Sequence, residues 1–402
     1  MHEKTGAANK IKSGHSPALV SVVVPVFNGG EDFDRCLGAV FRTDWPAFEC
    51  IVVDDASSDK LTAEIAGRHG AKLERMEQRC GPAVARNKGV GKARGEIIFF
   101  TDADVLLHPD AMGKAVTALE SDPDLAAVFG SYDNTPGHGS FLSRYRNLYH
   151  HWNHQVGNEE ASTFWTGCGA IRREVFFEMG GFNSDYTRPS IEDIELGYRL
   201  REAGYRIRLL KTMLGTHLKQ WKFQDMLLTD IFRRGVPWIV LLLQYRSAPA
   251  DLNLNLRARA ATVSAALLLP IMLLLPLAGH VKAIIPALAL FLAAVICSRL
   301  TKDPDLKKTS SGWKSPLALL IGILMPLLAL AWVPDPWALL PLVLIAVIVW
   351  AQKEFYYLLS ERGGVGFAIA AVPFQLLFFM GCALSVPLGV LAWLRHGRGH
   401  TP

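Results

Sequence analysis

The chain has 402 residues, of which 50% are hydrophobic and only 20% are charged, and its formal net charge is +5. A soluble protein usually carries about 25% charged residues, and the mean hydropathy of this chain is positive, so the composition predicts a membrane-embedded part. The Lys and Arg residues that give the mild positive charge gather near the apolar segments. Basic residues beside a bilayer are explained by the positive-inside rule and by attraction to anionic lipids. Nucleic acid is therefore not expected as a partner.

Residues 1–17 are polar and lack the apolar core of a signal peptide. We expect a disordered tail, followed by a domain that stays in the cytosol. The six cysteines are scattered, without CxxC spacing. This pattern is typical of free thiols in a reducing compartment rather than of a disulfide framework.

Residues 18–230 alternate between expected strands and helices. The strands are apolar runs at 19–26, 49–54, 96–102 and 124–132, and the helices are expected at 32–42, 59–69, 82–91 and 109–120. This order predicts an α/β domain with a Rossmann-like, mostly parallel sheet and helices on both faces. In such a sheet, ligands bind at the C-terminal ends of the strands.

The C-terminal part contains apolar stretches at 261–279, 282–299, 316–333 and 336–352, and a longer run at 365–394. Because a bilayer-spanning helix takes about 20 residues, we expect residues 261–395 to form an all-α transmembrane bundle of four to five helices. The final run leaves two alternatives. It is either one long tilted helix, or it breaks near 381–387 and returns the C-terminal bases to the inner side.

Charge asymmetry predicts the orientation of these helices. The loop 299–315 holds five bases, whereas the turn 334–336 holds none, so the loop is expected in the cytoplasm together with residues 18–230. Between the two parts, residues 231–260 begin with bases and continue with Trp238 and leucines. This pattern is typical of an amphipathic segment in the membrane interface.

The motif TDAD (101–104) directly follows an apolar strand. Asp102 and Asp104 can both reach one divalent cation, and hard oxygen ligands suit Mg²⁺ or Mn²⁺. Such an ion bridges phosphates and neutralises the charge that grows on a departing diphosphate. The structural alternative is a solvated turn before the next helix.

Two further acidic groups accompany this motif. Asp54 and Asp55 end a buried strand, where they can accept hydrogen bonds from a base or ribose, while Asp59 or a serine caps the next helix. Glu192, Asp193 and Glu195 lie in the first turn of a helix, where its dipole favours acids. Beyond that role, Asp193 can act as general base toward an acceptor hydroxyl.

Six segments occur in the following order: VPVFN (24–28), VVDDASSD (52–59), GPAVARNKG (81–89), GEIIFFTDAD (95–104), TGCGAIRREVFFEMGGFN (166–183) and EDIELGYRL (192–200). With these segments in this order, residues 18–240 resemble family 2 glycosyltransferases. The resemblance implies a GT-A fold. It also implies a nucleotide-diphosphate sugar as donor and inversion at the anomeric carbon by direct displacement.

The resemblance also implies roles for single residues. It assigns the nucleotide pocket to Pro25, Asn28, Asp54 and Asp55. Arg86 and Lys88 lie where related enzymes place a donor-binding base, although the alternative for Arg86 is a solvated helix face.

The remaining roles concern the metal and the base. Asp102 and Asp104 resemble the metal motif, with Asp102 also at the donor, and Asp193 resembles the catalytic base. His217 is expected as a further ligand of the metal or the diphosphate. His150, His151 and His154 lie on a predicted helix and are expected to form an aromatic, polar wall near the acceptor opening rather than a zinc site.

The chain departs from one branch of the family. Processive polysaccharide synthases carry Gln-x-x-Arg-Trp where this chain reads RRGVPW (233–238), and no membrane helix is expected before the catalytic domain. We therefore expect transfer of a sugar to a lipid or lipid-linked acceptor at the cytoplasmic face of the membrane. The alternatives are a processive synthase or exporter, and a non-catalytic membrane scaffold in which the site carboxylates would be lost.

Overall fold

The structure is a computed structural model of the chain. It describes residues 16–246, 249, 251–300, 328–329, 332 and 335–396. The basic loop at 301–315, most of the span expected at 316–333 and most of the expected tail lie outside the described residues.

The described residues form one eight-stranded sheet in the order β3-β2-β1-β4-β7-β6-β8-β5. Antiparallel pairing is confined to β7 and β5, which run against the other six strands. The strands are β1 (Val20–Val26), β2 (Phe48–Asp54), β3 (Lys72–Arg75), β4 (Ile97–Thr101), β5 (Val105–Leu107), β6 (Leu125–Tyr132), β7 (Cys168–Arg172) and β8 (Arg206–His217).

Helices cover both faces of this sheet. The helices of the sheet region are α1 (Gly30–Val40), α2 (Leu61–His69), α3 (Pro82–Gly91), α4 (Ala111–Ser121), α5 (Phe141–Val156), α6 (Arg173–Glu178) and α7 (Glu192–Glu202). The expected α/β fold class with a mostly parallel sheet is confirmed. The four expected strands and four expected helices are each present to within two or three residues at their ends.

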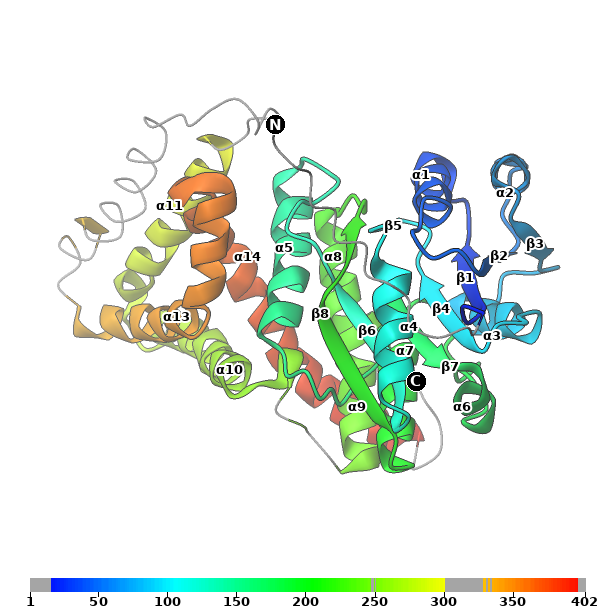
Figure 1. Cartoon of the computed structure of the whole chain (residues 1–402). Coiled ribbons are helices and arrows are strands. Elements are labelled where there is room, and N and C mark those ends of the chain that lie inside the picture. The colour runs from blue at the N-terminus through cyan, green and yellow to red at the C-terminus, as the bar shows by residue number, and fades with distance from the viewer. Residues whose placement is uncertain are drawn as a thin grey trace, which may run out of the picture.

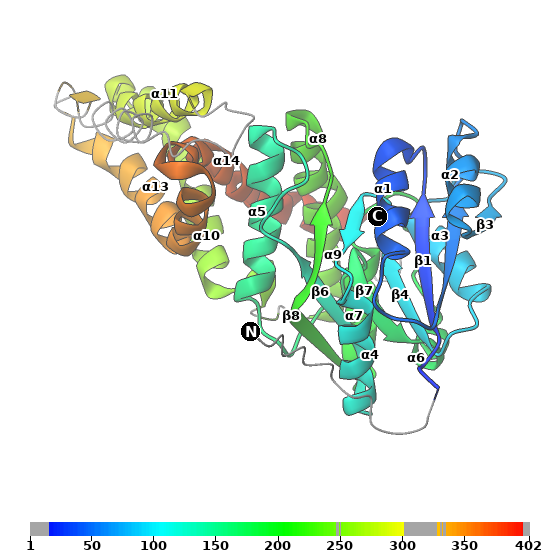
Figure 2. The same ribbon diagram turned by 45° about the horizontal axis from the view of Figure 1, so that its top comes forward.

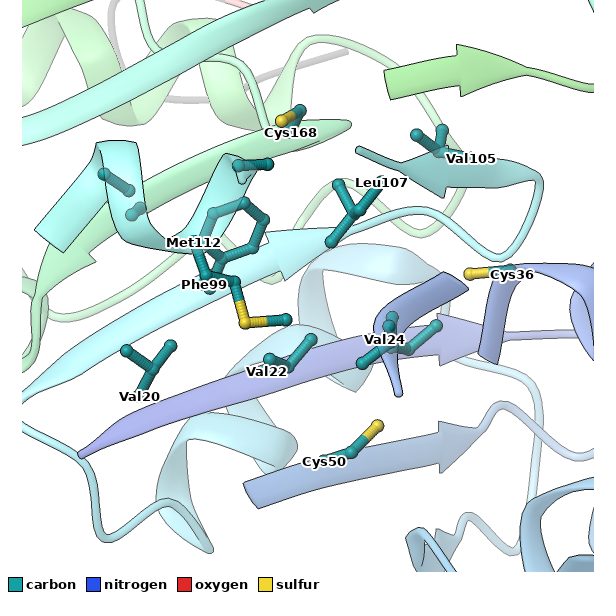
Figure 3. Close-up of a cluster of buried hydrophobic side chains, with 14 of the residues drawn as sticks. Val20, Val22, Val24, Cys36, Cys50, Phe99, Val105, Leu107, Met112 and Cys168 are labelled. Carbon is teal, nitrogen blue, oxygen red and sulfur yellow. The ribbon is translucent and has the colours of Figure 1, made fainter. Parts of the chain in front are cut away.

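Alternation along β1 explains the two-sided core. Val20, Val22 and Val24 point into a cluster with α1, α2 and α4, whereas Val23 points to the other face, against α3, α6 and α7. Successive side chains of a strand face opposite sides of the sheet, so a run of β-branched residues buried on both faces is what such a central strand needs. Figure 3 shows the first cluster, in which Cys36, Cys50 and Cys168 are labelled among the apolar side chains. These three are buried free thiols.

The rest of the chain is helical. It comprises α8 (Phe223–Leu228), the π-helix η1 (Thr229–Gly235), α9 (Val236–Tyr245), η2 (Leu252–Leu254), α10 (Leu256–Leu277), η3 (Val281–Ile284), α11 (Ile285–Leu300), η4 (Pro336–Ala338), α13 (Leu339–Ala351) and α14 (Lys353–His396). In both ribbon views α5 lies between the sheet and the group formed by α10, α11 and α13 (Figures 1 and 2).

Helix α14 joins the two groups. Its aromatic residues Phe355 and Phe367 form one buried cluster with Tyr145 and Tyr149 of α5, and the Tyr145 hydroxyl donates to Gln375 Oε1 at 2.6 Å. Farther along, a Cβ built at Gly389 would lie 2.5 Å from Ile239 of α9. The C-terminal helix is therefore packed on the sheet region along much of its length.

The break considered near 381–387 is wrong. The helix continues through these residues, and its non-helical backbone is at Gly364 instead, with φ 78°. The physical reason is that Gly381 provides close packing rather than a turn, because a Cβ there would lie 3.1 Å from Ile231 of η1.

Two helices among the described residues are long and apolar enough to cross a membrane, Leu256–Leu277 and Lys353–Arg395. Shorter apolar helices lie at Val281–Leu290 and Pro336–Ala351. The described C-terminal region is thus helical, as expected.

Glu49 ties three strands together at the edge of the sheet opposite the strand C-termini. Its carboxylate accepts from Ser21 Oγ at 2.7 Å, Lys72 Nζ at 2.6 Å and the Arg94 backbone N–H at 2.7 Å. Burial opposes ionisation, but the hydrogen bonds from Lys72, Arg94 and Ser21 outweigh it and lower the pKa of Glu49 to about 2.

This depressed pKa gives the first prediction. A carboxylate whose folded pKa lies below its unfolded value of 4.5 adds stability above that value and loses it as the pH falls through the folded pKa. Glu49→Gln should therefore lower the melting temperature at pH 7, and the difference from wild type should shrink below pH 4.5. Glu64→Gln, at an exposed position of α2, is the matched control. Equal melting temperatures for both variants at pH 7 would contradict the role of Glu49.

Candidate active site

A cavity of about 660 Å³ opens where the C-terminal ends of the central strands meet the C-terminal helices. Seven of the ten residues assigned from the sequence line it: Pro25, Asp55, Arg86, Asp102, Asp104, Asp193 and His217. Residues of α9, α10 and α14 complete the wall, among them Leu242, Val263 and Val386. The cavity therefore extends from the sheet to the helices that carry the apolar surface.

The strand end after β2 shapes one end of this cavity. Asp55 accepts hydrogen bonds from the backbone N–H groups of Cys80 at 2.7 Å and Gly81 at 2.9 Å. Gly81 has φ 91°, and a Cβ there would lie 2.4 Å from the Thr187 carbonyl oxygen, so only glycine fits. The turn that Asp55 holds carries Arg79, whose guanidinium lies 3.8 Å from the Phe27 ring centroid.

Three assigned residues do not line the cavity. Asn28 accepts from the backbone N–H of Ser58 at 2.9 Å, and the fully buried Asp54 accepts from that of Ser57 at 2.8 Å. Lys88 donates to the Arg75 carbonyl at 2.8 Å. These side chains shape the strand-end loops around the cavity.

Arg86 is buried and joins two acidic groups. It donates to Asp102 Oδ1 at 2.7 Å and to Glu192 Oε1 at 2.8 Å, and its side chain is 5% exposed. The alternative of a solvated helix face is therefore wrong for Arg86. Burial opposes its charge, but Asp102 and Glu192 outweigh burial and raise the pKa of Arg86, so the guanidinium stays charged.

Asp104 and His217 face one another at 3.4 Å between Oδ2 and Nε2. His217 Nδ1 lies 2.7 Å from Asn147 Oδ1, and this contact holds the imidazole ring so that Nε2 faces the carboxylate. Burial raises the pKa of Asp104, but His217 and Lys219 outweigh it and hold that pKa below its usual value.

This donor set fits a divalent ion. Carboxylates and an imidazole nitrogen are accepted ligands of Mn²⁺ and Mg²⁺, and Asp102, Asp104 and His217 all line the cavity. No group of three His, Cys, Asp or Glu side chains within the described ranges is close enough to hold a metal by itself, because Asp102 is turned toward Arg86. A bound ion would need further oxygens from a ligand in the cavity.

Asp193 begins helix α7 beside the cavity. Its Oδ2 accepts from both the backbone N–H and the hydroxyl of Thr166, each at 3.2 Å, and its Oδ1 accepts from the Ile194 backbone N–H at 2.8 Å. Burial, and then the charge of Glu192, raise the pKa of Asp193 to about 6 against the opposing effect of Arg86. A carboxylate with this pKa is a stronger base than an ordinary aspartate and is mostly ionised at pH 7.

The other acids of this helix have structural partners. Glu195 forms a two-point ion pair with Arg199, at 2.7 and 2.8 Å. Glu192 binds Arg86 and accepts from the Ser190 backbone N–H at 2.9 Å. The Ser190 hydroxyl in turn donates to the Arg233 carbonyl at 2.5 Å, so the loop before the base is attached to η1.

Several cavity residues were not identified from the sequence as site residues. Lys219 follows His217 by two positions, and Arg233 and Arg234 lie in η1. The sequence signal for this part of the site is the pair of consecutive bases Arg233 and Arg234, which we assign from the sequence to a membrane-interface segment instead. Of the three α5 histidines expected from the sequence to form a polar wall, His150 and His154 line the cavity and His151 does not.

The comparisons with known proteins agree with this site. Residues 21–180 match the family model for glycosyl transferase family 2. Residues 146–220 match that for the N-terminal domain of galactosyltransferase. The residues of the strand ends and of α7 up to Asp193 lie inside one or both matched ranges.

Relatives with curated names cover parts of the chain. Over 117 residues the chain is 34% identical to an uncharacterized glycosyltransferase, YibD of Escherichia coli, covering 28% of this chain and 34% of the relative. It is 30% identical over 215 residues to the uncharacterized protein MT1568 of Mycobacterium tuberculosis, covering 49% and 67%. It is 27% identical to glycosyltransferase AglE of Haloferax volcanii, covering 50% and 66%. The chain thus spans about a third to two thirds of the length of these relatives.

Among solved structures, the chain is similar to the mannosyltransferase PcManGT from Pyrobaculum calidifontis in complex with GDP-Man and Mn²⁺. The sequence identity is 18%, the TM-score is 0.47, and the match covers 94% of this chain and 88% of the other.

The chain belongs to glycosyltransferase family 2. The match marks it as a glycosyltransferase, and the α/β fold class with a mostly parallel sheet expected from the sequence is confirmed.

The buried bridge made by Arg86 gives the second prediction. Arg86→Gln leaves the carboxylates of Asp102 and Glu192 without their shared counter-charge, and breaking a buried ion pair in this way costs about 3–5 kcal/mol. We expect a lower melting temperature and a loss of turnover. Lys88→Gln changes the same charge on the same helix at a position outside the cavity and serves as control. If both variants melt and turn over alike, Arg86 does not hold the site together.

Proposed function

We propose that this chain transfers a sugar, with inversion, from a nucleotide-diphosphate sugar to a hydroxyl of a lipid or lipid-linked acceptor at the cytoplasmic face of the membrane. One observation carries the proposal. A single cavity is lined both by the strand-end residues typical of a donor site and by side chains of α10 and α14, which among the described residues are the two helices long and apolar enough to span a bilayer.

The donor nucleotide fits the end of the cavity formed by Pro25, Phe27 and the Arg79 turn. This part offers a flat aromatic and guanidinium surface suited to a base. Asp55 keeps the turn in place by its two hydrogen bonds from Cys80 and Gly81, so its contribution to nucleotide binding includes shaping the pocket.

The diphosphate fits beside Asp102, Asp104 and His217. Asp102, Asp104 and His217 would hold a divalent ion, Mg²⁺ or Mn²⁺, which would supply positive charge to the departing diphosphate. Lys219, Arg233 and Arg234 line the same cavity and supply further positive charge for the leaving group.

Asp193 takes the proton of the acceptor hydroxyl. Thr166 and Ile194 fix the orientation of its carboxylate, and its raised pKa matches a group that must accept a proton near neutral pH. A phosphate acceptor would be ionised already and would need no base, so the presence of this base favours a hydroxyl nucleophile.

The acceptor approaches from the side of the membrane helices. Val263 of α10 is 60% exposed and lines the cavity, and Leu273 and Leu277 farther along the same helix are 68% and 83% exposed. Such a continuous apolar surface is stable against lipid rather than water. A lipid tail lying on this surface places its polar head in the cavity.

The role of a metal gives the third prediction. EDTA should abolish transfer, and Mn²⁺ or Mg²⁺ should restore it. His217→Ala should raise the metal concentration needed for half-maximal transfer, whereas His151→Ala, a half-buried change on α5 outside the cavity lining, should not. Full activity in excess EDTA would rule out the metal.

The role of Asp193 gives the fourth prediction. Asp193→Asn keeps the size of the side chain but cannot take a proton, so turnover should fall by about 10²–10⁴-fold while donor affinity stays nearly unchanged. In the wild type, turnover should decline as the pH falls through about 6, the value to which the pKa of this base is raised, because the base is then protonated.

The matched control for Asp193→Asn is Glu195→Gln on the same helix, which breaks only the ion pair with Arg199. Donor affinity by calorimetry and turnover by product assay, measured on both variants, separate binding from catalysis. Normal turnover of Asp193→Asn, or a defect confined to donor affinity, would place the base elsewhere. The length of the product from one purified preparation distinguishes a single transfer from a processive synthase.

A further inference from the structure

Beside the catalytic base the cavity has an aromatic platform that the transfer reaction described above does not use. Trp165 lines the cavity and immediately precedes Thr166, whose N–H and hydroxyl both bind Asp193. The indole is thus one residue away from the group that orients the base.

The indole of Trp165 is fixed from several sides. Tyr132 meets it edge-on with ring centroids 4.7 Å apart, and His154 does so at 4.8 Å. A Cβ built at Gly167 would lie 2.2 Å from the indole Cζ2, so the ring occupies the space that any other residue at 167 would fill. The side chain is only half-buried despite these contacts, which leaves part of the ring available to a ligand.

The neighbouring polar groups are neutral. His154 lines the cavity, and its Nδ1 is buried without a hydrogen-bond partner in the part of the chain that the structure describes. Burial lowers the pKa of His154 to about 4, so it is an uncharged donor or acceptor at pH 7. Arg234 is the cation that approaches this wall, with Nη1 at 3.5 Å from His150 Nε2.

A flat ring surface flanked by uncharged hydrogen-bonding groups is complementary to a sugar. The C–H bonds on one face of a pyranose make an apolar patch that packs on an aromatic ring, and the hydroxyls at its rim need polar partners. A simple alcohol head would leave the exposed part of the Trp165 ring without a packing partner.

On these grounds, and resting on the proposed function, we propose that the acceptor is a glycolipid whose head group is a sugar ring that packs on Trp165. The enzyme then extends an existing glycosyl head group, with Asp193 removing the proton from one of its hydroxyls. The class of reaction that supplies this acceptor is an earlier glycosylation of the lipid.

The experiment compares two acceptor probes that differ only in the sugar, octyl β-glucoside and 1-octanol, with the full chain and a donor nucleotide sugar that it uses. Wild type should transfer to the glucoside with kcat/KM at least about tenfold above that for octanol. Trp165→Leu should raise KM for the glucoside about tenfold, the loss of one aromatic packing contact, and leave donor affinity unchanged. Trp165→Tyr should restore most of the loss. Trp337→Leu, at a half-exposed position outside the cavity, is the matched control.

Equal use of both probes, or an unchanged KM in Trp165→Leu, would overturn this proposal. The proposed function has a separate readout, the transfer of labelled sugar into the native membrane-lipid fraction. Absence of labelled lipid would refute lipid transfer itself, whereas labelled lipid whose product carries a single sugar on a bare alcohol would refute only the sugar-headed acceptor.

Discussion

The site depends on one buried cation shared by two carboxylates. Arg86 of α3 binds Asp102 at the end of β4 and Glu192 at the start of α7, so it joins three elements that are separated by up to 106 residues in sequence. Two carboxylates buried without it would repel one another and resist ionisation. The ion bridge brings Asp102, proposed for the metal site, and the start of α7, which carries the proposed base Asp193, to one cavity.

The same charge arrangement gives the two consecutive acids Glu192 and Asp193 different properties. Glu192 is neutralised by Arg86, whereas Asp193 receives only neutral hydrogen bonds from Thr166 and Ile194. Consecutive acids therefore differ in basicity, which is how protein sites separate a structural carboxylate from a reactive one. A base without a direct cationic partner keeps a raised pKa.

Much of the sheet could be predicted from sequence because β1, β2, β4 and β6 are long apolar runs. β3, β5 and β7 could not be predicted, because they are short: β3 is polar, β5 has only three residues and β7 contains a glycine. These segments are strands because they pair with neighbouring strands, not because of their own sequence pattern. The residues at the strand ends could be predicted from the sequence, but the direction in which their side chains point could not. Successive positions along a strand point to opposite sides, so Asp55, directly after β2, lines the cavity, while Asp54, the last residue of β2, is fully buried.

Helix geometry explains a similar error on α3. Residues that are two positions apart in a helix lie about 200° apart around its axis. Arg86 and Lys88 therefore cannot both face one ligand. The expected domain boundary at 230 falls inside η1, because composition changes there while the chain continues as one run of helical turns. Long-range contacts such as His217 with Asn147 leave no pattern in a single sequence.

The packing of α14 against the rest of the site has a consequence for biosynthesis. The residues that match the two family models end at 220, yet Cys382, Ser385 and Val386 line the cavity. A Cβ at Gly235 of η1 would lie 2.2 Å from Ser385 Oγ. A ribosome that has released the whole family domain has therefore still to make more than a hundred residues before the last wall of the active site exists. The cavity is therefore complete only after α14 has been made.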